Sequence, residues 1–352
     1  MKNIQVGILG YGMAGQVFHA PIINCITGMT IKSIRTKNPY WSSVAKERYP
    51  GVTIVAESNE IIDDPEIDLV IVVTPNEFHY PLAKEALLAG KNVVVDKPFT
   101  VTSTEALELI QLASERDLLL SVYQNRRFVA DFRTVEKVIK SKRLGRLVEV
   151  TMNFDRFRND FNGNWREDDV PGSGILYDLG SHLIDQSIYL FGLPEFITAD
   201  LRNQRGGKAN DYFDIRLDYP GLKVNVRSGM LVKIPGPVFK LNGTNGTFEK
   251  FGLDIQEGAL TAGLTPNTQA HWGEEPPEQY GKLNILVNNE DFIETIKSEP
   301  GDYRLYYQNI YDALTHKNKL LVNPLDALNT IKIIEIALSS NEKKRTLPMT
   351  KD

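Results

Sequence analysis

Apolar residues follow two different patterns along the chain, and the pattern changes near residue 123. Before it, continuous apolar runs alternate with helical stretches. The predicted strands are 3–9, 30–35, 52–55, 68–73, 92–95 and 118–122, and the predicted helices are 13–24, 42–48, 79–89 and 104–116. Strands without alternation, separated by helices, indicate a doubly wound parallel sheet of the Rossmann type. Such sheets bind ligands at the carboxyl ends of their strands.

After residue 123, long stretches in which apolar and polar residues alternate predict antiparallel strands. These stretches are 147–157, 196–203, 211–219 and 222–233, with a further pair at 238–250 joined by a hairpin turn, NGTNG. Helical patterns cover about 129–142 and about 325–340. We therefore expect a second, α+β domain with a large, mostly antiparallel sheet.

A length of 352 residues suits two domains, which we place at 1–122 and 123–352. The helix at 325–340 is a candidate to pack back against the first domain. Because that second sheet would leave one face open, we expect the chain to form a homodimer or homotetramer.

Composition excludes several classes of function. A net charge of −5 argues against a general nucleic-acid binder, and no apolar run approaches the roughly 18 residues of a membrane span. Cys25 is the only cysteine, so neither an internal disulfide nor a cysteine zinc cluster is expected. The chain enters a strand at once, which leaves no room for a signal peptide. We expect a cytoplasmic protein.

The sequence GYGMAG at 10–15 is a Gly-x-Gly-x-x-Gly motif between a predicted strand and a predicted helix. In a dinucleotide site Gly10 permits the tight turn, Gly12 lets the backbone approach the pyrophosphate, and Gly15 lets helix and strand pack closely. The alternative is an ordinary structural turn. The predicted cofactor contacts here are Gly10, Tyr11, Gly12, Met13, Ala14 and Gly15.

The end of the second strand bears on the choice between NAD and NADP. Enzymes that use NAD usually carry an acid there for the ribose 2′-hydroxyl, but this chain has no acid between Met1 and Glu47. Ser33, Arg35, Thr36 and Lys37 offer hydroxyls and positive charge instead. This pattern favours NADP over NAD, and the alternative is a solvated basic turn.

A second group of candidate residues lies in GSGILYDLGSHLIDQ at 172–186. On a regular helix Asp178, His182 and Asp185 would share one face, and a histidine between carboxylates can serve as a general base. Gly172 and Gly174 would let the preceding loop approach another segment closely. The alternatives are a metal site and a purely structural arrangement. Of the three roles we predict the general base, and we expect no metal.

The stretch VVVDKPF at 93–99 ends a predicted core strand with a charged amine. Because the fifth strand of a doubly wound sheet ends near the ligand crevice, Lys97 is expected to project there. An ammonium in that place can stabilise a developing alkoxide.

Together these motifs resemble the Gfo/Idh/MocA family of pyridine-nucleotide oxidoreductases over nearly the whole chain. GILGYGMAG at 7–15, VVTPNEFHYPLAKEALLAGKNVVVDKPF at 72–99 and LYDLGSHLIDQ at 176–186 carry the resemblance. The family's usual Glu-Lys-Pro appears here as Asp96-Lys97-Pro98, and in that family the Lys-Pro peptide is commonly cis.

The resemblance implies roles for named residues. Lys97, Asp178 and His182 would be the catalytic trio. Cofactor contacts near the nicotinamide would come from Thr74, Pro75, Asn76, His79, Asp96, Lys97 and Asn125. Arg126 would lie near the substrate as well.

Within the family, the closest likeness is to the branch that contains NADP-dependent scyllo-inositol dehydrogenase. It rests on YGMAGQVFHAPII, FDRFRNDFNGNWRE and GTFEKFGLDIQEGAL. The middle segment offers Arg156, Arg158, Trp165 and Arg166 as hydrogen-bond donors around a polyol substrate, and its alternative role is a solvated loop.

We therefore expect an NADP-dependent dehydrogenase of a cyclic polyol or sugar, with NAD as the alternative cofactor. His182 would accept the hydroxyl proton, Lys97 would stabilise the alkoxide, and Asp178 would orient the histidine or the substrate. Two other functions stay open for this fold: an NAD-dependent glycosidase and a non-catalytic dinucleotide sensor.

Overall fold

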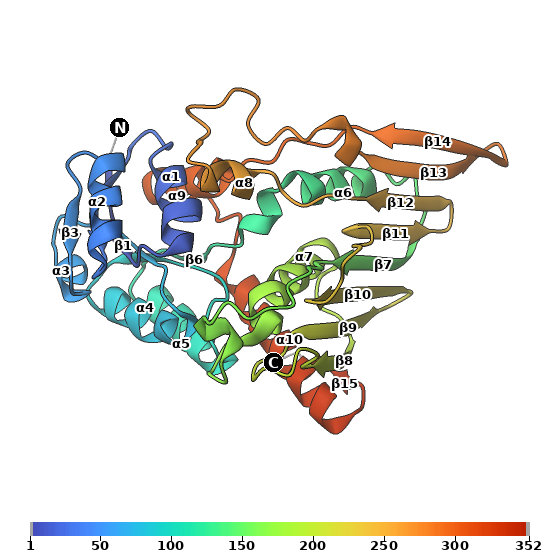
Figure 1. Ribbon diagram of the computed structural model, residues 1–352, viewed down its shortest axis with the longest axis horizontal. Coiled ribbons are helices and arrows are strands. Elements are labelled where there is room, and N and C mark those ends of the chain that lie inside the picture. The colour runs from blue at the N-terminus through green and yellow to red at the C-terminus, as the bar shows by residue number, and fades with distance from the viewer. Residues whose placement is uncertain (1–2, 350–352) are drawn as a thin grey trace. The chain divides into compact units, whose positions relative to one another are not determined.

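In the computed structural model, which describes residues 3–349, the first six strands form one parallel sheet (Figure 1). The strands are β1 (Ile4–Leu9), β2 (Met29–Arg35), β3 (Thr53–Val55), β4 (Leu69–Val72), β5 (Asn92–Val95) and β6 (Leu120–Val122). Their order is β3-β2-β1-β4-β5-β6, and every neighbouring pair is parallel. The order reverses between β1 and β4, which is where such sheets bind dinucleotides. The predicted doubly wound sheet is confirmed.

Helices separate these strands, as the apolar pattern predicts. They are α1 (Ala20–Ile23), α2 (Pro39–Arg48), α3 (Asn59–Ile62), α4 (His79–Leu88) and α5 (Ser103–Glu115). A π-helical turn, Gly15–His19, leads directly into α1. The capping box of Thr102 and Glu105 forms at the start of α5. All four residues of β4 are buried, which explains its unbroken apolar run.

The chain forms two compact units, and later segments complete the first one. This unit contains residues 1–125, 256–272 and 302–328, including α8 (Gln256–Thr261) and α9 (Arg304–His316). The edge strand β6 is tied to these segments, because the Ser121 hydroxyl receives a hydrogen bond from Tyr306 and donates one to the Val322 carbonyl, both at 3.0 Å. A division into 1–122 and 123–352 would assign them to the other unit.

The second unit contains residues 126–255, 273–301 and 329–352 and is built on a nine-stranded sheet. Its strands are β7 (Leu147–Asn153), β8 (Phe196–Arg202), β9 (Tyr212–Tyr219), β10 (Leu222–Gly229), β11 (Phe239–Gly243), β12 (Gly246–Lys250), β13 (Gly281–Val287), β14 (Glu290–Ile296) and β15 (Leu347–Pro348). In the order β14-β13-β12-β11-β7-β10-β9-β8-β15, β7 and β10 are parallel and the other neighbours are antiparallel. The mostly antiparallel sheet is as expected.

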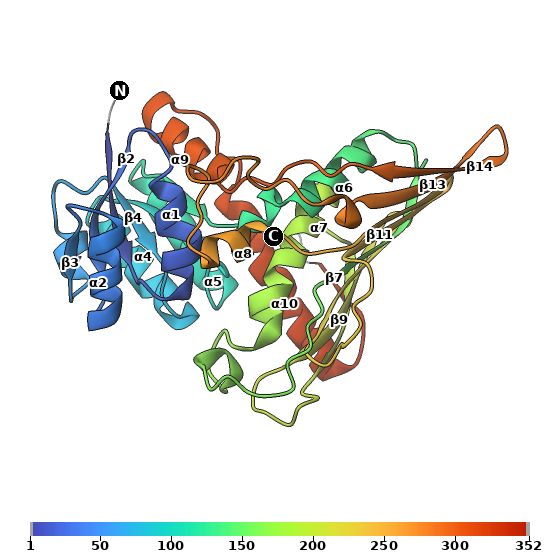
Figure 2. The ribbon, with the colours of Figure 1, turned by 45° about the horizontal axis from the view of Figure 1, so that its top comes forward.

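Helices α6 (Ala130–Lys140) and α7 (Ser181–Phe191) lie along one face of this sheet, which Figure 2 shows nearly edge-on. Val150, Val226 and Leu241 are fully buried in the sheet. Residues that adjoin buried positions in these strands carry charge and form ion pairs, such as Lys223 with Glu149 at 2.7 Å. Helix α10 (Pro324–Lys343) is the last helix in the described part of the chain. Its Ser340 and Asn341 side chains accept hydrogen bonds from backbone N–H groups of β8.

Short turns complete the described part of the chain. A second π-helical turn covers Leu176–Gly180, and 3₁₀ turns cover Asn76–Phe78, Asn125–Phe128, Trp165–Glu167 and Pro277–Gln279. Within residues 3–349, no helix has the length and apolar character needed to cross a membrane.

Candidate functional site

The glycine-rich loop follows β1 and has the geometry that a dinucleotide site needs. Gly10 has φ of +115°, and a Cβ on it would lie 2.2 Å from the Val73 carbonyl oxygen. A Cβ on Gly15 would lie 2.5 Å from the Gly10 carbonyl oxygen, whereas a Cβ on Gly12 would meet no atom within 4 Å. The outer two glycines therefore allow the backbone to pack, and Gly12 leaves open space at the start of a helix, where a pyrophosphate binds. The residues present fit a nicotinamide dinucleotide.

Other residues of this loop differ in what they can offer. Tyr11 is only 2% exposed, so a cofactor could contact its backbone but not its side chain. Met13, by contrast, is 61% exposed. Burial raises the pKa of the Tyr11 phenol. The Tyr11 ring therefore packs in the core of the first unit.

The turn after β2 presents the basic residues that the sequence predicts, with one correction. Arg35 donates from Nε to the Ala56 carbonyl at 3.2 Å, and Lys37 forms an exposed ion pair with Glu57 at 2.8 Å. Ser33 lies inside β2 and is only 3% exposed. We therefore remove Ser33 from the predicted cofactor contacts and retain Arg35, Thr36 and Lys37.

The loops after β4 and β5 hold the residues that the family resemblance places near the nicotinamide. Thr74 and Pro75 precede the turn Asn76–Phe78, and Asn76 is 6% exposed. After β5, the Asp96 carboxylate accepts the backbone N–H of Lys97 at 2.8 Å, and the Lys97–Pro98 peptide bond is cis, as the resemblance implies. Asn125 follows β6.

Two buried histidines of the same unit flank these loops. The Nε2 atom of His19 lies 3.6 Å from Asp96, and its Nδ1 lies 2.6 Å from the Tyr307 hydroxyl. His79 is 1% exposed, with its two ring nitrogens at 2.8 Å from the Pro98 carbonyl and 2.9 Å from the Thr74 carbonyl. Because both nitrogens of His79 face protein carbonyls, we assign it a supporting role rather than the direct cofactor contact expected from the sequence.

In the second unit, Asp178 lines a hollow that is open to solvent. Its polar lining includes Arg158, Asn162, Asn164, Arg166, Asp178 and Asn210. The Arg166 guanidinium lies 3.5 Å from the Asp178 carboxylate and stacks on the Trp165 ring at 4.7 Å. A Cβ on Gly174 would lie 2.4 Å from the Asn210 amide, so this glycine allows the close approach that the sequence predicts.

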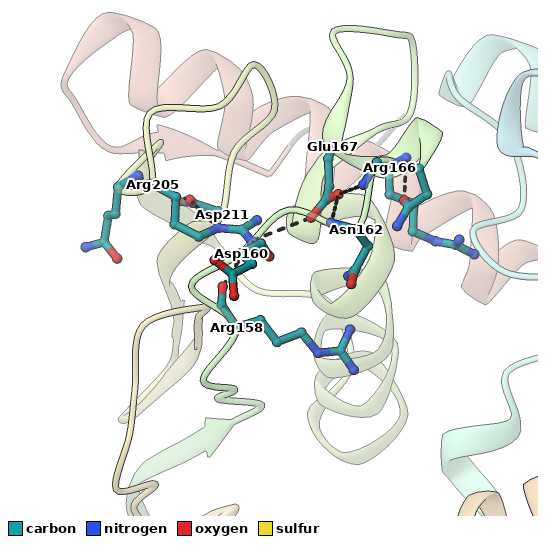
Figure 3. A network of polar contacts seen from close by, with 10 residues as sticks. Arg158, Asp160, Asn162, Arg166, Glu167, Arg205 and Asp211 are labelled. Atoms are coloured by element: carbon teal, nitrogen blue, oxygen red, sulfur yellow. Dashed lines mark hydrogen bonds and ion pairs between the residues drawn. The ribbon is translucent and has the colours of Figure 1, made fainter.

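Arg205, which the sequence analysis does not identify, holds the loops around this hollow together (Figure 3). Its side chain is 6% exposed and pairs with Asp211 at 3.0 Å. It also donates to the Arg158 carbonyl at 3.0 Å and stacks on Phe161 at 4.6 Å. Glu167 lies 3.5 Å from the same guanidinium. A buried arginine paired in this way fixes loop geometry more than it offers charge to solvent.

His182 lines a different cavity of the second unit, together with Arg126, Asp131 and Phe154. The predicted residues Asp178, His182 and Asp185 lie in two consecutive elements. Asp178 lies in the π-helical turn Leu176–Gly180, and His182 lies in α7, which follows directly. Asp185 instead forms a bidentate ion pair with Arg127, at 2.6 and 2.8 Å, and both side chains are almost fully buried.

Asp131 is a second residue that the sequence analysis misses. It is 3% exposed on α6, and burial raises the pKa of its carboxyl to about 7, against the lowering effect of Arg126. The signal lay in the sequence: Asp131, Val135 and Val138 have the spacing of one helical stripe. A carboxyl on an apolar stripe indicates a buried acid.

Two further substrate candidates, Arg126 and Arg156, also lie in the second unit. Arg126 and Arg156 both stack on the Phe154 ring, at 5.0 and 5.2 Å. Lys97 lies in the first unit. Among the described residues, no cluster of three or more histidine, cysteine, aspartate or glutamate side chains is arranged to hold a metal ion.

Comparisons with known proteins cover both units. Residues 4–124 match the NAD-binding Rossmann fold of the Gfo/Idh/MocA oxidoreductase family, and residues 136–349 match the family's C-terminal alpha/beta domain. The family match spans the glycine-rich loop and both groups of candidate residues.

Individual relatives agree with this. The chain is 39% identical over 348 residues to scyllo-inositol 2-dehydrogenase (NADP(+)) IolW of Bacillus subtilis, covering 99% of this chain and 96% of that protein. It is 40% identical to the uncharacterized oxidoreductase YdgJ of Escherichia coli, covering 98% of each. The solved structure of YvaA from Bacillus subtilis superposes with a TM-score of 0.96 at 39% identity, over 99% of both chains. The chain thus belongs to the Gfo/Idh/MocA family of oxidoreductases and carries its NAD(P)-binding Rossmann domain.

Proposed function

We propose that this enzyme is an NADP-dependent dehydrogenase that oxidises a secondary alcohol of a neutral cyclic polyol or sugar, or reduces the corresponding ketone. The observation that carries the proposal is the lining of the Asp178 hollow, where amide and guanidinium donors surround a carboxylate. A ring with several hydroxyl groups needs such a set of donors and acceptors. The named activity of the Bacillus subtilis relative supports the same class of substrate.

The charges around this hollow balance, which favours a neutral substrate over an acid. Three guanidinium groups (Arg158, Arg166 and Arg205) and two carboxylates (Glu167 and Asp178) line it. The third carboxylate, Asp211, does not line the hollow but pairs with Arg205 at 3.0 Å. A hydroxy acid would bring a further negative charge next to Asp178 and would lose the hydration of its carboxylate. A neutral polyol has neither cost.

For the cofactor, the turn after β2 supports NADP. Arg35, Thr36 and Lys37 stand where an acid would hold the ribose of NAD. The chain's backbone at Gly10–Gly15 would hold the pyrophosphate, and the loops at Thr74 and Asp96 would contact the nicotinamide end. When bound, the cofactor supplies the carbon that exchanges a hydride with the substrate.

The chain's own side chains then move the proton and hold the developing charge. We assign to His182 the role of general base, which takes the hydroxyl proton on Nδ1 or Nε2. This role requires the reacting hydroxyl to extend from the Asp178 hollow to His182, which lines a different cavity. We assign to Lys97 a hydrogen bond to the substrate oxygen as its charge develops. Asp178 accepts a neighbouring hydroxyl and orients the ring.

A spectrophotometric assay with scyllo-inositol, myo-inositol and glucose, each with NADP and with NAD, tests this function. We expect turnover of at least one neutral ring, with NADP preferred. Efficient turnover of a hydroxy acid with failure of every neutral ring would contradict the substrate class. Release of a sugar from a glycoside without net cofactor change would indicate the glycosidase instead.

The NADP preference has its own variant. Arg35→Asp removes one or two charge-assisted hydrogen bonds to the 2′-phosphate, about 1.5–3 kcal/mol each, and adds an acid. The gap between NADP and NAD affinity should narrow or reverse, as fluorescence titration with each reduced cofactor would show. Equal affinities for NADP and NAD in the unchanged protein would contradict the assignment of Arg35 to the 2′-phosphate.

A further inference from the structure

His79 joins two loops of the first unit that follow neighbouring strands. It is the first residue of α4 and directly follows the turn Asn76–Phe78, which places its ring beneath the loop after β4. Its Nε2 lies 2.9 Å from the carbonyl oxygen of Thr74 in that loop. Its Nδ1 lies 2.8 Å from the carbonyl oxygen of Pro98, in the loop that carries Lys97. One buried ring therefore contacts both loops.

The surroundings of the ring indicate how it bonds. Burial lowers the pKa of His79, while Asp96 and the backbone groups of Pro98, Thr74 and Phe99 raise it, and burial has the larger effect. A neutral imidazole carries one N–H, so at neutral pH it donates to one of the two carbonyls.

The direction of the Lys97 side chain depends on where its own backbone is held. On one side, the Asp96 carboxylate accepts the Lys97 N–H at 2.8 Å. On the other side, the carbonyl of the next residue, Pro98, is held by His79. The peptide unit before the Lys97 Cα and the peptide unit that follows Pro98 therefore each have a fixed partner, and Lys97 lies between them.

We propose that His79 is a positioning residue, which aims the Lys97 ammonium through a hydrogen bond from Nδ1 to the Pro98 carbonyl. The proposal rests on the role that the proposed function gives to Lys97. It assigns His79 no contact with substrate or cofactor, since both ring nitrogens face protein carbonyls. A misplacement of about 1 Å at a reacting group can cost about 10²-fold in rate.

Two substitutions of similar size separate the two contacts. In His79→Asn the amide nitrogen takes about the place of Nδ1 and keeps the bond to Pro98. In His79→Gln it takes about the place of Nε2 and keeps the bond to Thr74. We expect His79→Asn to keep kcat within about threefold and His79→Gln to lower it by roughly 10–10², with KM for the polyol and NADPH affinity changed much less.

A double-mutant cycle with Lys97→Ala tests whether His79 acts through Lys97. If it does, His79→Gln should lower the residual turnover of Lys97→Ala by less than about twofold. An equal loss in both backgrounds, or normal turnover in His79→Gln, would overturn the proposal while leaving the proposed function intact. Normal turnover in Lys97→Ala alone would instead overturn the role of Lys97, and the positioning role with it.

The unmodified protein gives an independent measurement should either variant fail to fold. Two-bond ¹H–¹⁵N spectra of protein labelled at its 5 histidines report which ring nitrogen carries the proton. The His79 resonances are assigned by replacing each of the other four histidines in turn, because they remain in every one of these variants. A proton on Nδ1 supports the proposal, and a proton on Nε2 alone overturns it.

Discussion

Replacing Asp131 with Asn is expected to change how the free energy of unfolding depends on pH. The carboxyl is 3% exposed. Burial raises its pKa from 3.8 to about 7, against the lowering effect of Arg126; Asp254 and Glu275 raise it further and Lys250 lowers it. In the unfolded chain the same carboxyl is hydrated and has its ordinary pKa. Between these two values the folded protein holds a proton that the unfolded chain has lost.

The sign and the magnitude follow from this difference. Because the folded state binds more protons between about pH 4 and about pH 7, stability decreases as the pH rises through that range. The stabilisation is fully present below the unfolded pKa and is lost above the folded one. A shift from 3.8 to about 7 corresponds to about 4 kcal/mol, at about 1.36 kcal/mol for each pKa unit.

Asp131→Asn keeps the acceptor for the Phe132 N–H, which lies 2.5 Å from the carboxylate, but it cannot ionise. Urea unfolding followed by tryptophan fluorescence gives the free energy at about pH 5 and about pH 8. Between them the variant should gain about 2–3 kcal/mol relative to the unchanged protein. The exposed Asp291, changed to Asn, is the matched control and should give no gain. Parallel pH curves for Asp131→Asn and the unchanged protein would refute the reasoning.

Three further outcomes are expected. Gly12→Ala should leave the melting temperature unchanged but weaken NADPH binding in a fluorescence titration, whereas Gly15→Ala should lower the melting temperature, because its Cβ would lie 2.5 Å from a carbonyl oxygen. Lys97→Ala should lower kcat by about 10²–10³ and His182→Ala by about 10²–10⁴, without unfolding the protein; near-normal turnover in either would remove that residue from the mechanism. Arg205→Met should raise KM for the polyol more than it lowers kcat, because it loosens the loops around the Asp178 hollow; an unchanged KM would show that these loops do not contact substrate.

The sheet of the first unit could be read from the sequence because its strands are buried on both faces. The residues of β4 are apolar without a break. Pro39 marks the start of α2, and Gly90 follows the end of α4. The sequence analysis does not predict the hairpin of β13 and β14, although Leu283 and Ile285 alternate with exposed residues. Its turn is formed by Asn288 and Asn289, which both have positive φ. An Asn-Asn turn is a weaker signal than Asn-Gly.

Parts of the site depend on contacts that no local pattern contains. Asp185 has the spacing of a partner for His182, but its ion pair with Arg127 joins residues 58 apart in the chain. Arg205 and Asp211 lie in a polar loop that reads as solvated until the segment near Arg158 meets it. No local pattern distinguishes the π-helical turn at Asp178 from ordinary α-helix, although Gly180 packs closely there: a Cβ on it would lie 3.0 Å from the Leu176 side chain.

The return of residues 302–328 to the first unit has a consequence for the order of events during synthesis. The first six strands leave the ribosome early, but the segment that ties down Ser121 of β6 follows roughly 200 residues later. At about 5–20 residues per second, this delay is on the order of 10–40 s. During that time the nascent sheet has an uncovered edge where Tyr123 will later meet the rings of Tyr306 and Tyr307. A ribosome-bound chain that ends before residue 300 should therefore be cut by proteases and held by chaperones, even though every strand of its nucleotide-binding sheet has already been made.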